Sequence, residues 1–549
     1  MHGSMMHRPL SIIDILTFAR DTHGASDIVS ATVEGGIHRQ TYRETYDRVC
    51  QLAHGLRGLG VGLGTRVATL AWNGYRHFEL YYAISGIGAV CHTMNPRLSA
   101  EQMIYIMDHA QDQVLFVDLT FVPLIEALVT AHGAALPKGM RIVVMTDAAH
   151  MPDSALDLLC YEDLLAPHPA DMDWPELDET TASSLCYTSG TTGNPKGALY
   201  THRSTVLHAL MAGVSFQRCL RPGQRVLPVV PLFHVNAWGL PYAAPLTGAS
   251  IVFPGPALDG ASLFRLMEAE RVFSAWGVPT VWQGLLAEIA TQGRMPEGFG
   301  EVIVGGSAAP RSMIAAFEDQ GVSVCHAWGM TEMSPIGTQG HLDPPLADLP
   351  REAQLDLKQK QGRRTFGVEL KIVDEAGQRL PHDGVATGEL FVRGNTVVSG
   401  YFNNAAATEA AMDADGWFGT GDVASIGTDG FLQITDRAKD LIKSGGEWIS
   451  SIDVENLAMA HPSVASCAVI AVPHPKWDER PLLVVVPAQA DGFDPAGVLD
   501  HLRAHLARYQ VPDDVVTVEA LPLTATGKVS KRTLRQNFGD YVLPDLRDT

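Results

Sequence analysis

The segment with the clearest chemistry is a glycine- and hydroxyl-rich loop, Tyr187-Thr-Ser-Gly-Thr-Thr-Gly-Asn-Pro-Lys-Gly197. Its glycines let backbone N–H groups approach phosphate oxygens closely, while its hydroxyls and Lys196 add donors and positive charge. It is not the GxxxxGK[ST] loop of common nucleotide hydrolases, because Pro195 stands in place of the second glycine. The loop therefore predicts a phosphate-binding site of another kind.

Seven further motifs follow this loop in order along the chain. They are Pro231-Leu-Phe-His234, Gly305-Gly-Ser-Ala-Ala-Pro310, Trp328-Gly-Met-Thr-Glu332, Gly416-Trp-Phe-Gly-Thr-Gly-Asp422, Asp436-Arg-Ala-Lys-Asp440, Lys443-Ser-Gly-Gly446 and Thr524-Ala-Thr-Gly-Lys528. Together with the loop they resemble the adenylate-forming superfamily, which contains acyl-CoA synthetases, luciferases and the adenylation domains of peptide synthetases. The resemblance covers nearly the whole chain. It implies that a carboxylate attacks the α-phosphate of ATP, that pyrophosphate leaves, and that the thiol of coenzyme A then displaces AMP.

The resemblance assigns catalytic roles to Lys528, Thr188, Glu332 and Lys196. Thr188 and Glu332 are similar to residues that help to hold Mg²⁺, a hard cation that prefers oxygen ligands. Lys528 resembles the lysine that bridges the carboxylate and the α-phosphate, where a positive charge lets two anions meet. ATP and coenzyme A are the implied co-substrates, and Mg²⁺ is the implied cofactor.

Larger sets of residues are implied to bind the substrates. The nucleotide set is Thr188, Ser189, Gly190, Thr191, Thr192, Gly193, Lys196, His234, Val235, Gly306, His326, Ala327, Trp328, Gly329, Met330, Thr331, Asp422, Arg437, Lys439 and Lys443. Within it, Asp422 resembles the carboxylate that accepts both ribose hydroxyls, and Trp328 stands where most such enzymes have a tyrosine. The acyl set is His234, Trp238 and Gly306, and the coenzyme A set is Gly445, Gly446, Glu447 and Trp448. Asp436 is similar to the hinge about which a small domain rotates between the two half-reactions.

The identity of the acid depends on the segment His234-Val-Asn-Ala-Trp-Gly239, which resembles fatty acyl-CoA synthetases. In that branch the tryptophan gates the acyl tunnel, whereas core packing is the other interpretation of Trp238. Adenylation domains for amino acids carry an aspartate directly after the phenylalanine of this motif. Here His234 follows Phe233, so nothing offers a charge to a substrate ammonium. We therefore expect a medium- to long-chain fatty acid, with 3-methylthiopropionate or another short-chain acid as the alternative.

Two other functional classes share parts of this pattern. A serine hydrolase would need a GxSxG nucleophile elbow, but Gly305-Gly-Ser-Ala-Ala309 lacks the final glycine. A non-catalytic AMP-binding protein would keep the nucleotide motifs but could lose the catalytic lysine or the hinge, and both are present. Pyrophosphate release that depends on acid, ATP and Mg²⁺ separates an enzyme from such a sensor.

These residues must be positioned by a fold of the α/β class. Tyr46, Val49 and Leu52 recur at helical spacing, and Arg66-Val-Ala-Thr-Leu-Ala-Trp72 is typical of a buried strand. Similar units continue through residues 114–117 and 141–145, a pattern of largely parallel sheets with flanking helices. We therefore predict a large N-terminal domain of mixed or parallel sheets over residues 1–435.

A small mobile α+β C-terminal domain, residues 436–549, is expected to carry Lys528 behind the Asp436 hinge. Within it the pattern predicts helices over residues 452–459 and 495–508. Strands are predicted over residues 465–472 and 482–487.

Composition limits the partners and the compartment. The formal net charge of −21 disfavours nucleic acid as a partner. The seven cysteines form no CxxC pair and are odd in number, so we expect reduced thiols in a cytoplasmic protein. Residues 226–258 lack charged side chains, but their prolines would interrupt a spanning helix, so no transmembrane segment is predicted. The resemblance adds a homodimer as the expected assembly.

Overall fold

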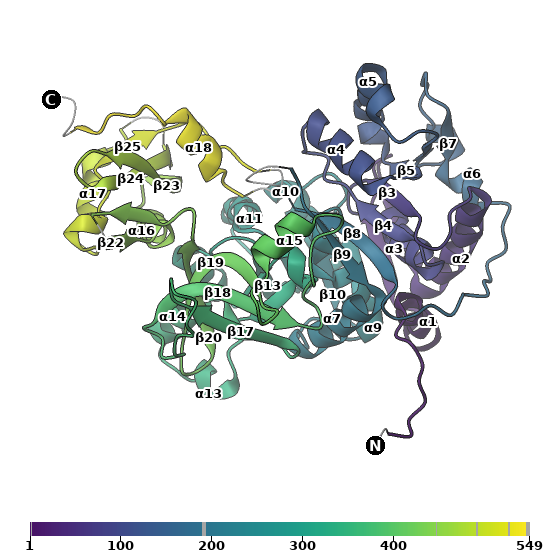
Figure 1. The fold of residues 1–549 in the computed structure, drawn as a ribbon, viewed down its shortest axis with the longest axis horizontal. Coiled ribbons are helices and arrows are strands. Elements are labelled where there is room, and N and C mark those ends of the chain that lie inside the picture. The colour runs from purple at the N-terminus through teal and green to yellow at the C-terminus, as the bar shows by residue number, and fades with distance from the viewer. Residues whose placement is uncertain (2, 189–193, 446, 490–491, 525–527, 545–549) are drawn as a thin grey trace.

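The computed structural model describes residues 1, 3–188, 194–445, 447–489, 492–524 and 528–544. Its N-terminal part contains a 7-stranded and a 13-stranded sheet, and its C-terminal part contains a 5-stranded sheet (Figure 1). This arrangement confirms the predicted α/β class with a large N-terminal and a small C-terminal region.

The 7-stranded sheet carries the phosphate loop. Its strands, in spatial order, are β7 (Leu158–Cys160), β6 (Arg141–Val144), β5 (Val114–Val117), β3 (Arg66–Leu70), β4 (Val90–Thr93), β8 (Ala182–Tyr187) and β9 (Gly197–Thr201). Neighbouring strands are parallel except β8 and β9, which form the antiparallel pair on either side of the loop. The predicted strands over 66–72, 114–117 and 141–145 are thus present, with the first ending at Leu70.

The 13-stranded sheet has a parallel half and an antiparallel half. In the parallel half lie β14 (Ser323–Gly329), β13 (Glu301–Val304), β12 (Ser274–Gly277), β10 (Arg225–Pro228), β11 (Ser250–Phe253) and β1 (Asp27–Ala31), with β2 (Ile37–Thr41) antiparallel at the edge. The antiparallel half continues through β15 (Ile336–Gln339), β16 (Gly362–Arg364), β20 (Phe431–Arg437), β19 (Phe418–Ile426), β18 (Thr387–Gly394) and β17 (Val368–Val373).

Helices and sheets alternate in layers because each parallel strand is apolar on both faces. In β5, Val114 and Phe116 belong to one core, while Leu115 and Val117 belong to another. The core between the two sheets contains α1 (Ile12–His23), α2 (Tyr42–Gly58), α3 (Tyr75–Gly86), α7 (His202–Ser215) and α9 (Leu240–Thr247). The outer layers contain α4 (Ala100–Ala110) and α5 (Val122–His132) on one side, and α10 (Gly260–Glu270), α11 (Pro279–Gln292) and α12 (Arg311–Glu318) on the other.

Shorter helices connect these layers. They are α6 (Tyr161–Leu165), α13 (Pro344–Ala347), α14 (Arg351–Gln359) and α15 (Ala405–Ala411). The uncharged run over residues 226–258 contains β10, α9 and β11, so it is folded into the core. Among the described residues, no helix has both the length and the apolar character needed to cross a bilayer.

The small C-terminal region has helices on both faces of its sheet. The strands run in the order β22 (Glu447–Ile449), β21 (Ile442–Ser444), β24 (Asp478–Pro487) and β23 (Val464–His474), with β25 (Asp514–Thr517) also paired to β24. One face packs against α16 (Ser451–Ala458) and α17 (Pro495–Arg503), and the other packs against α18 (Lys531–Asn537). The helix predicted to reach residue 508 ends at Arg503, and the chain continues as a short 3₁₀ turn over Arg508–Gln510.

Candidate active site

Most of the predicted site residues lie at the edge where parallel strands end. Thr188 follows β8, Gly305 and Gly306 follow β13, and Trp328 and Gly329 close β14. Ligands of open α/β sheets bind at the carboxyl ends of the strands. This edge is therefore the candidate nucleotide site.

Two hydrogen bonds close the stem of the phosphate loop. The Thr188 backbone N–H donates to the Lys196 carbonyl at 2.9 Å, and the Lys196 N–H donates to Thr188 Oγ1 at 3.3 Å. These bonds extend the β8–β9 ladder and bring two predicted catalytic residues together. The phosphate contacts predicted for residues 189–193 stay predictions, because those positions lie outside the described residues.

Glu332 is buried, with only 5% of its surface exposed. The Tyr401 hydroxyl donates to Glu332 Oε1 at 2.7 Å, and Lys196 Nζ lies 5.0 Å from the centre of the Tyr401 ring. Burial raises the pKa of Glu332, while the Tyr401 hydrogen bond and the charges of Arg437 and Lys196 oppose the rise. Tyr401 thus connects two predicted catalytic residues.

Sequence reasoning missed Tyr401. It stands in the uncharged segment Gly400-Tyr-Phe402, 69 residues from Glu332, with no motif spacing between them. The backbone supplies the connection, because the Val398 N–H donates to the Glu332 carbonyl at 2.8 Å and brings this segment beside the short turn that carries Glu332.

The oxygen atoms of Thr188 and Glu332 suit Mg²⁺, which prefers hard oxygen ligands. The side-chain partner of the Glu332 carboxylate is the neutral Tyr401 hydroxyl, and burial raises the Glu332 pKa, so a cation beside the carboxylate would offset a desolvated charge. The described ranges hold no group of three or more His, Cys, Asp or Glu side chains that could form a metal cage. Nucleotide-bound Mg²⁺ commonly has one or two protein carboxylates and completes its shell with phosphate and water. The donor set fits that mode.

Asp422 is buried at the end of the nucleotide edge. The Trp328 indole N–H donates to Asp422 Oδ2 at 3.0 Å, and Arg437 Nε lies 3.2 Å from Oδ1. The register of β19 on β20, which pairs Asp422 with Arg437, sets this geometry. Each carboxylate oxygen keeps a further lone pair for a ligand hydroxyl. Three predicted nucleotide residues therefore meet, and Trp328 orients Asp422.

The end of β14 forms a wall of backbone beside them. His326 Nδ1 lies 2.9 Å from the Gln359 carbonyl, and burial lowers the His326 pKa to about 4, so the ring is neutral. A Cβ on Gly329 would lie 1.9 Å from the Pro335 carbonyl oxygen, so only glycine fits there. Ala327, Met330 and Thr331 complete this segment, and their contacts with a nucleotide remain predictions.

Lys528 enters this site from the small C-terminal region. A Cβ placed on Gly306 would lie 3.2 Å from Lys528 Cε and 3.7 Å from Nζ, so the missing side chain leaves room for the lysine. Gly306 also has φ +81°, which favours glycine. Burial and then the charge of Arg437 lower the Lys528 pKa to about 8, although Asp422 and Glu332 oppose the shift. The fold thus brings together residues from motifs more than 200 positions apart.

His234 and Trp238 are the other two residues of the acyl set. The Trp238 ring fills the space beside Gly305, where a Cβ would lie 2.9 Å from Trp238 Cη2. The pKa of His234 falls to about 3, first through burial and then through the charge of Lys528, so this side chain is neutral. Both predicted acyl residues therefore lie close to the Gly305–Gly306 pair or to Lys528.

The backbone between His234 and Gly239 is unusual. Val235, Asn236, Ala237 and Trp238 have φ angles of +46°, +51°, +46° and +56°. This segment, labelled α8 (Val235–Trp238) and called the gate turn below, is therefore left-handed. Such a conformation costs roughly 1–2 kcal/mol per non-glycine residue. Among these residues only Asn236 is of a type that adopts this conformation readily, so Val235, Ala237 and Trp238 give no sequence signal for it.

Asp436 lies at the joint between the two regions. It occupies β20 opposite Val423, and its carboxylate accepts hydrogen bonds from Ser451 N–H at 2.7 Å and Ser451 Oγ at 2.5 Å. Ser451 begins α16, so the carboxylate connects the large sheet to the small region. The predicted hinge role and the boundary at residue 436 stay predictions.

The coenzyme A set lies beyond this joint. Gly445 has φ +60°, its N–H donates to the Trp477 carbonyl at 2.8 Å, and a Cβ there would lie 2.8 Å from the Trp477 ring. Trp448 and Trp477 are both exposed, and Lys443 Nζ lies 5.5 Å from the Trp448 ring centre. Trp477 was not predicted. Gly446 lies outside the described residues.

Three further predicted residues lie in or beside the first strands of this region. Glu447 is exposed in β22, and Lys443 lies in β21. Lys439 lies between β20 and β21, where burial lowers its pKa. Their roles with nucleotide or coenzyme A stay predictions.

Comparison with known proteins identifies the family. A model described as AMP-binding enzyme matches residues 18–402, and one described as AMP-binding enzyme C-terminal domain matches residues 453–528. The chain is 50% identical to a 3-methylmercaptopropionyl-CoA ligase of Ruegeria pomeroyi, over 99% of this chain and 100% of that protein. It is 48% identical to a medium-chain-fatty-acid–CoA ligase of Ectopseudomonas oleovorans, over 99% and 98%.

A solved structure agrees with these relatives. An anthranilate CoA ligase in complex with anthranoyl-AMP superposes with a TM-score of 0.85 at 25% identity, covering 98% of this chain and 99% of that one. The chain belongs to the AMP-binding enzyme family, as one of its AMP-forming acid–CoA ligases.

Proposed function

We propose that the protein activates a medium- to long-chain fatty acid through an acyl-adenylate and then transfers the acyl group to coenzyme A. The observation that carries the proposal is Lys528 beside Gly306, where Asp422 and Glu332 influence its pKa and its charge influences the pKa of His234. One cation at the meeting point of two anionic substrates is what the first step requires.

In the first half-reaction a carboxylate oxygen of the acid attacks the α-phosphorus of ATP. The bond from that phosphorus to the bridging oxygen breaks, and pyrophosphate leaves with the electron pair. Lys528 holds the two anions together and offsets the charge that develops between them. Asp422, oriented by Trp328, accepts the ribose hydroxyls. Mg²⁺ held by Thr188 and Glu332 would supply charge neutralisation at the phosphates.

In the second half-reaction the thiol of coenzyme A attacks the acyl carbon, loses its proton, and displaces AMP to give the thioester. Gly445 and the exposed Trp448 would line the approach of the thiol. Rotation about Asp436 would withdraw Lys528 and bring the Gly445 loop to the site. Such alternation also protects the mixed anhydride from water.

The acid is proposed to be apolar because the acyl set offers no charge to it. His234 is neutral, and Trp238 presents a buried ring beside Gly305. The similar relative named for a medium-chain fatty acid supports this choice. The relative named for 3-methylmercaptopropionate supports a second candidate, a short thioether acid, which is apolar as well.

A chain-length series tests the proposal. Thioester formation should be measured with saturated acids of roughly three to eighteen carbons and with 3-methylthiopropionate, since each methylene in an apolar pocket changes kcat/KM by about tenfold or more. We expect kcat/KM to rise with length to a maximum at medium or long chains. A maximum at 3-methylthiopropionate would replace the first candidate by the second.

A further inference from the structure

The gate turn needs support from outside itself. Four consecutive non-glycine residues are left-handed, and Val235 is β-branched, for which positive φ is an outlier. Such strain persists only where the surrounding structure imposes it, and it concentrates at functional sites. The residues that impose it here are polar side chains buried in the apolar layer between the two sheets.

Asn236 provides the first connection. It is 3% exposed, and its Nδ2 donates to Ser184 Oγ at 3.0 Å. Its Oδ1 accepts from Cys186 Sγ at 3.3 Å and from the Tyr81 hydroxyl at 3.2 Å. Ser184 and Cys186 belong to β8, the strand that leads into Thr188. The amide therefore fixes the gate turn to the strand of the phosphate loop.

Tyr81 and Asn73 hold the chain that enters the turn. The Tyr81 hydroxyl also lies 2.5 Å from the Leu232 carbonyl oxygen. Its single proton is therefore shared between that carbonyl and Asn236 Oδ1. Asn73 Nδ2 donates to the carbonyls of Pro228 at 2.7 Å and Val230 at 3.0 Å, and its Oδ1 accepts from the Leu232 N–H at 2.6 Å. Both polar atoms of the Asn73 side chain therefore form hydrogen bonds with the segment that precedes His234.

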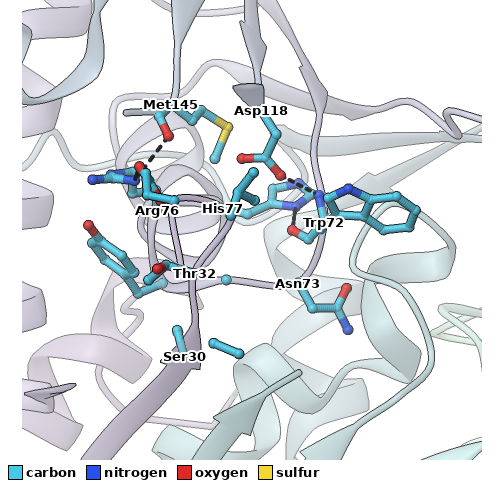
Figure 2. Close-up of a pocket in the computed structure, with 13 residues that line it drawn as sticks. Ser30, Thr32, Trp72, Asn73, Arg76, His77, Asp118 and Met145 are labelled. Carbon is cyan, nitrogen blue, oxygen red and sulfur yellow. Dashed lines mark hydrogen bonds and ion pairs between the residues drawn. The ribbon is translucent and has the colours of Figure 1, made fainter. Parts of the chain in front are cut away.

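The backbone next to Asn73 is held by hydrogen bonds to Asp118 and His77. Figure 2 shows it at the edge of a cavity of about 30 Å³, with its side chain directed away from Asp118 and His77. The Trp72 N–H donates to Asp118 Oδ2 at 2.6 Å, and His77 Nδ1 lies 3.1 Å from the Trp72 carbonyl (Figure 2). The support therefore runs from the Asp118 side of the 7-stranded sheet to the gate turn.

We propose that Asn236, assisted by Tyr81 and Asn73, is a positioning residue that sets Trp238 against Gly305 and thereby decides which acids reach Lys528. The amide acts through the gate turn rather than by touching the acid. The inference rests on the proposed function in taking an apolar acid as the ligand beside Trp238. Because Asn236 also forms hydrogen bonds with β8, the gate turn is held in a fixed position relative to the strand that leads into the phosphate loop.

The test compares two glycine substitutions within the turn. Asn236→Gly removes the amide but suits φ +51°, so backbone strain falls while the anchor is lost. Ala237→Gly relieves backbone strain at φ +46°, by more than the change at the asparagine does, and leaves the amide intact, so it is the control for strain relief alone. The readout is the ratio of kcat/KM for decanoate to that for 3-methylthiopropionate, together with KM for ATP.

We expect Asn236→Gly to move this ratio toward one by about tenfold, as the loss of buried hydrogen bonds predicts. The KM for ATP should stay within about threefold, and Ala237→Gly should keep the ratio within about twofold. Tyr81→Phe, which keeps the ring packed, should shift the ratio in the same direction. The double variant should be non-additive, since both changes act on one network.

Equal ratios in Asn236→Gly, Ala237→Gly and wild type would overturn the inference, and so would a uniform loss with every acid. Tyr81→Phe gives the same decision if Asn236→Gly fails to fold, because an unchanged ratio in that variant refutes the network. A wild-type enzyme that prefers 3-methylthiopropionate would refute the chain-length part of the proposed function alone. In that case a shift of the kcat/KM ratio toward one in Asn236→Gly would still support the positioning role of Asn236, and an unchanged ratio would still refute it.

Discussion

On the nucleotide side of the site, Glu332 and Asp422 are each fixed by a side chain from a distant part of the chain, while on the acyl side Trp238 is fixed by the conformation of its own backbone. Tyr401 orients one carboxylate and Trp328 the other, each through one hydrogen bond. The gate turn instead places Trp238 through four left-handed residues. The two carboxylates are thus held by direct hydrogen bonds, whereas Trp238 is held indirectly, through a strained backbone that the hydrogen bonds of Asn236 support.

This comparison predicts that the nucleotide and acyl halves fail in different ways. Loss of a polar side chain on the nucleotide side should lower the rate with every acid. Loss of the gate should change the relative rates among acids and leave ATP handling intact.

The largest effect is expected for Lys528→Ala, which removes the cation shared by the two halves. Acyl-AMP formation should fall by about 10²–10³, the usual effect of losing one charge-stabilising donor. Thioester formation from synthetic acyl-AMP and coenzyme A should stay close to wild type, because the lysine is proposed to leave before that step. Lys138→Ala, an exposed lysine far along the chain, is the control. Equal loss of both half-reactions in a folded variant would refute domain alternation.

The next largest loss of adenylation is expected for Glu332→Ala, and a smaller loss is expected for a change of its hydrogen-bond partner, Tyr401. Glu332→Ala should abolish most adenylation, because the phosphates would lose a charged metal ligand. Tyr401→Phe should lower kcat by about 10- to 100-fold with all acids alike, the usual range for a residue that orients a metal ligand. Titration of the rate with Mg²⁺ checks the assignment. A Glu332→Ala enzyme with near wild-type turnover at saturating Mg²⁺ and ATP would show that the carboxylate is not a ligand.

A pH profile sharpens the comparison without a substitution. Burial lowers the Lys528 pKa to about 8, and the lysine is proposed to act in its protonated form. The kcat/KM for adenylation should therefore be level below about pH 7 and fall by about tenfold per unit above pH 8, as the proton is lost. His234, with a pKa of about 3, should add no limb near neutrality. The alkaline limb should be absent from Lys528→Ala; its persistence there would assign the limb to another group.

The smallest effect on overall rate, and the largest on selectivity, is expected for Trp238→Ala. The ratio of kcat/KM between long and short acids should change by about tenfold, because an aromatic ring no longer fills the space beside Gly305. The KM for ATP should stay near wild type. An unchanged ratio combined with a loss of about 3–5 kcal/mol in stability would assign Trp238 to core packing.

Much of the fold was predictable because its signals are local. The strand at 114–117 was predicted with its observed ends, since an uninterrupted apolar run bounded by polar residues specifies a buried parallel strand. The end of the helix predicted to residue 508 was wrong, because Leu506 packs against the small core beyond the helix end at Arg503. An apolar residue that follows the helical spacing can therefore lie beyond the end of the helix and still pack against the core.

The candidate site was visible in the sequence through its polar motifs, whereas the residues that support them were not. Lys528, Glu332, Asp422 and Trp328 stand in short motifs whose residue types follow from the chemistry of phosphates and carboxylates. Tyr401, Trp477 and Tyr81 carry no such mark, because their role depends on a neighbour supplied by another element. The role of a single hydroxyl or ring cannot be predicted until the group that it contacts is known.

By itself, the sequence determined the α/β class, the phosphate loop and the order of the motifs, since periodicity and residue chemistry act over short spans. Only the tertiary structure decided that Lys528 lies beside Gly306, that Tyr401 bonds to Glu332, and that the gate turn is left-handed. These features arise from contacts between distant segments, where the free energy of packing outweighs local preference. Val235 and Trp238 make the point most clearly, because their intrinsic preference is for negative φ and the surrounding network holds them at +46° and +56°.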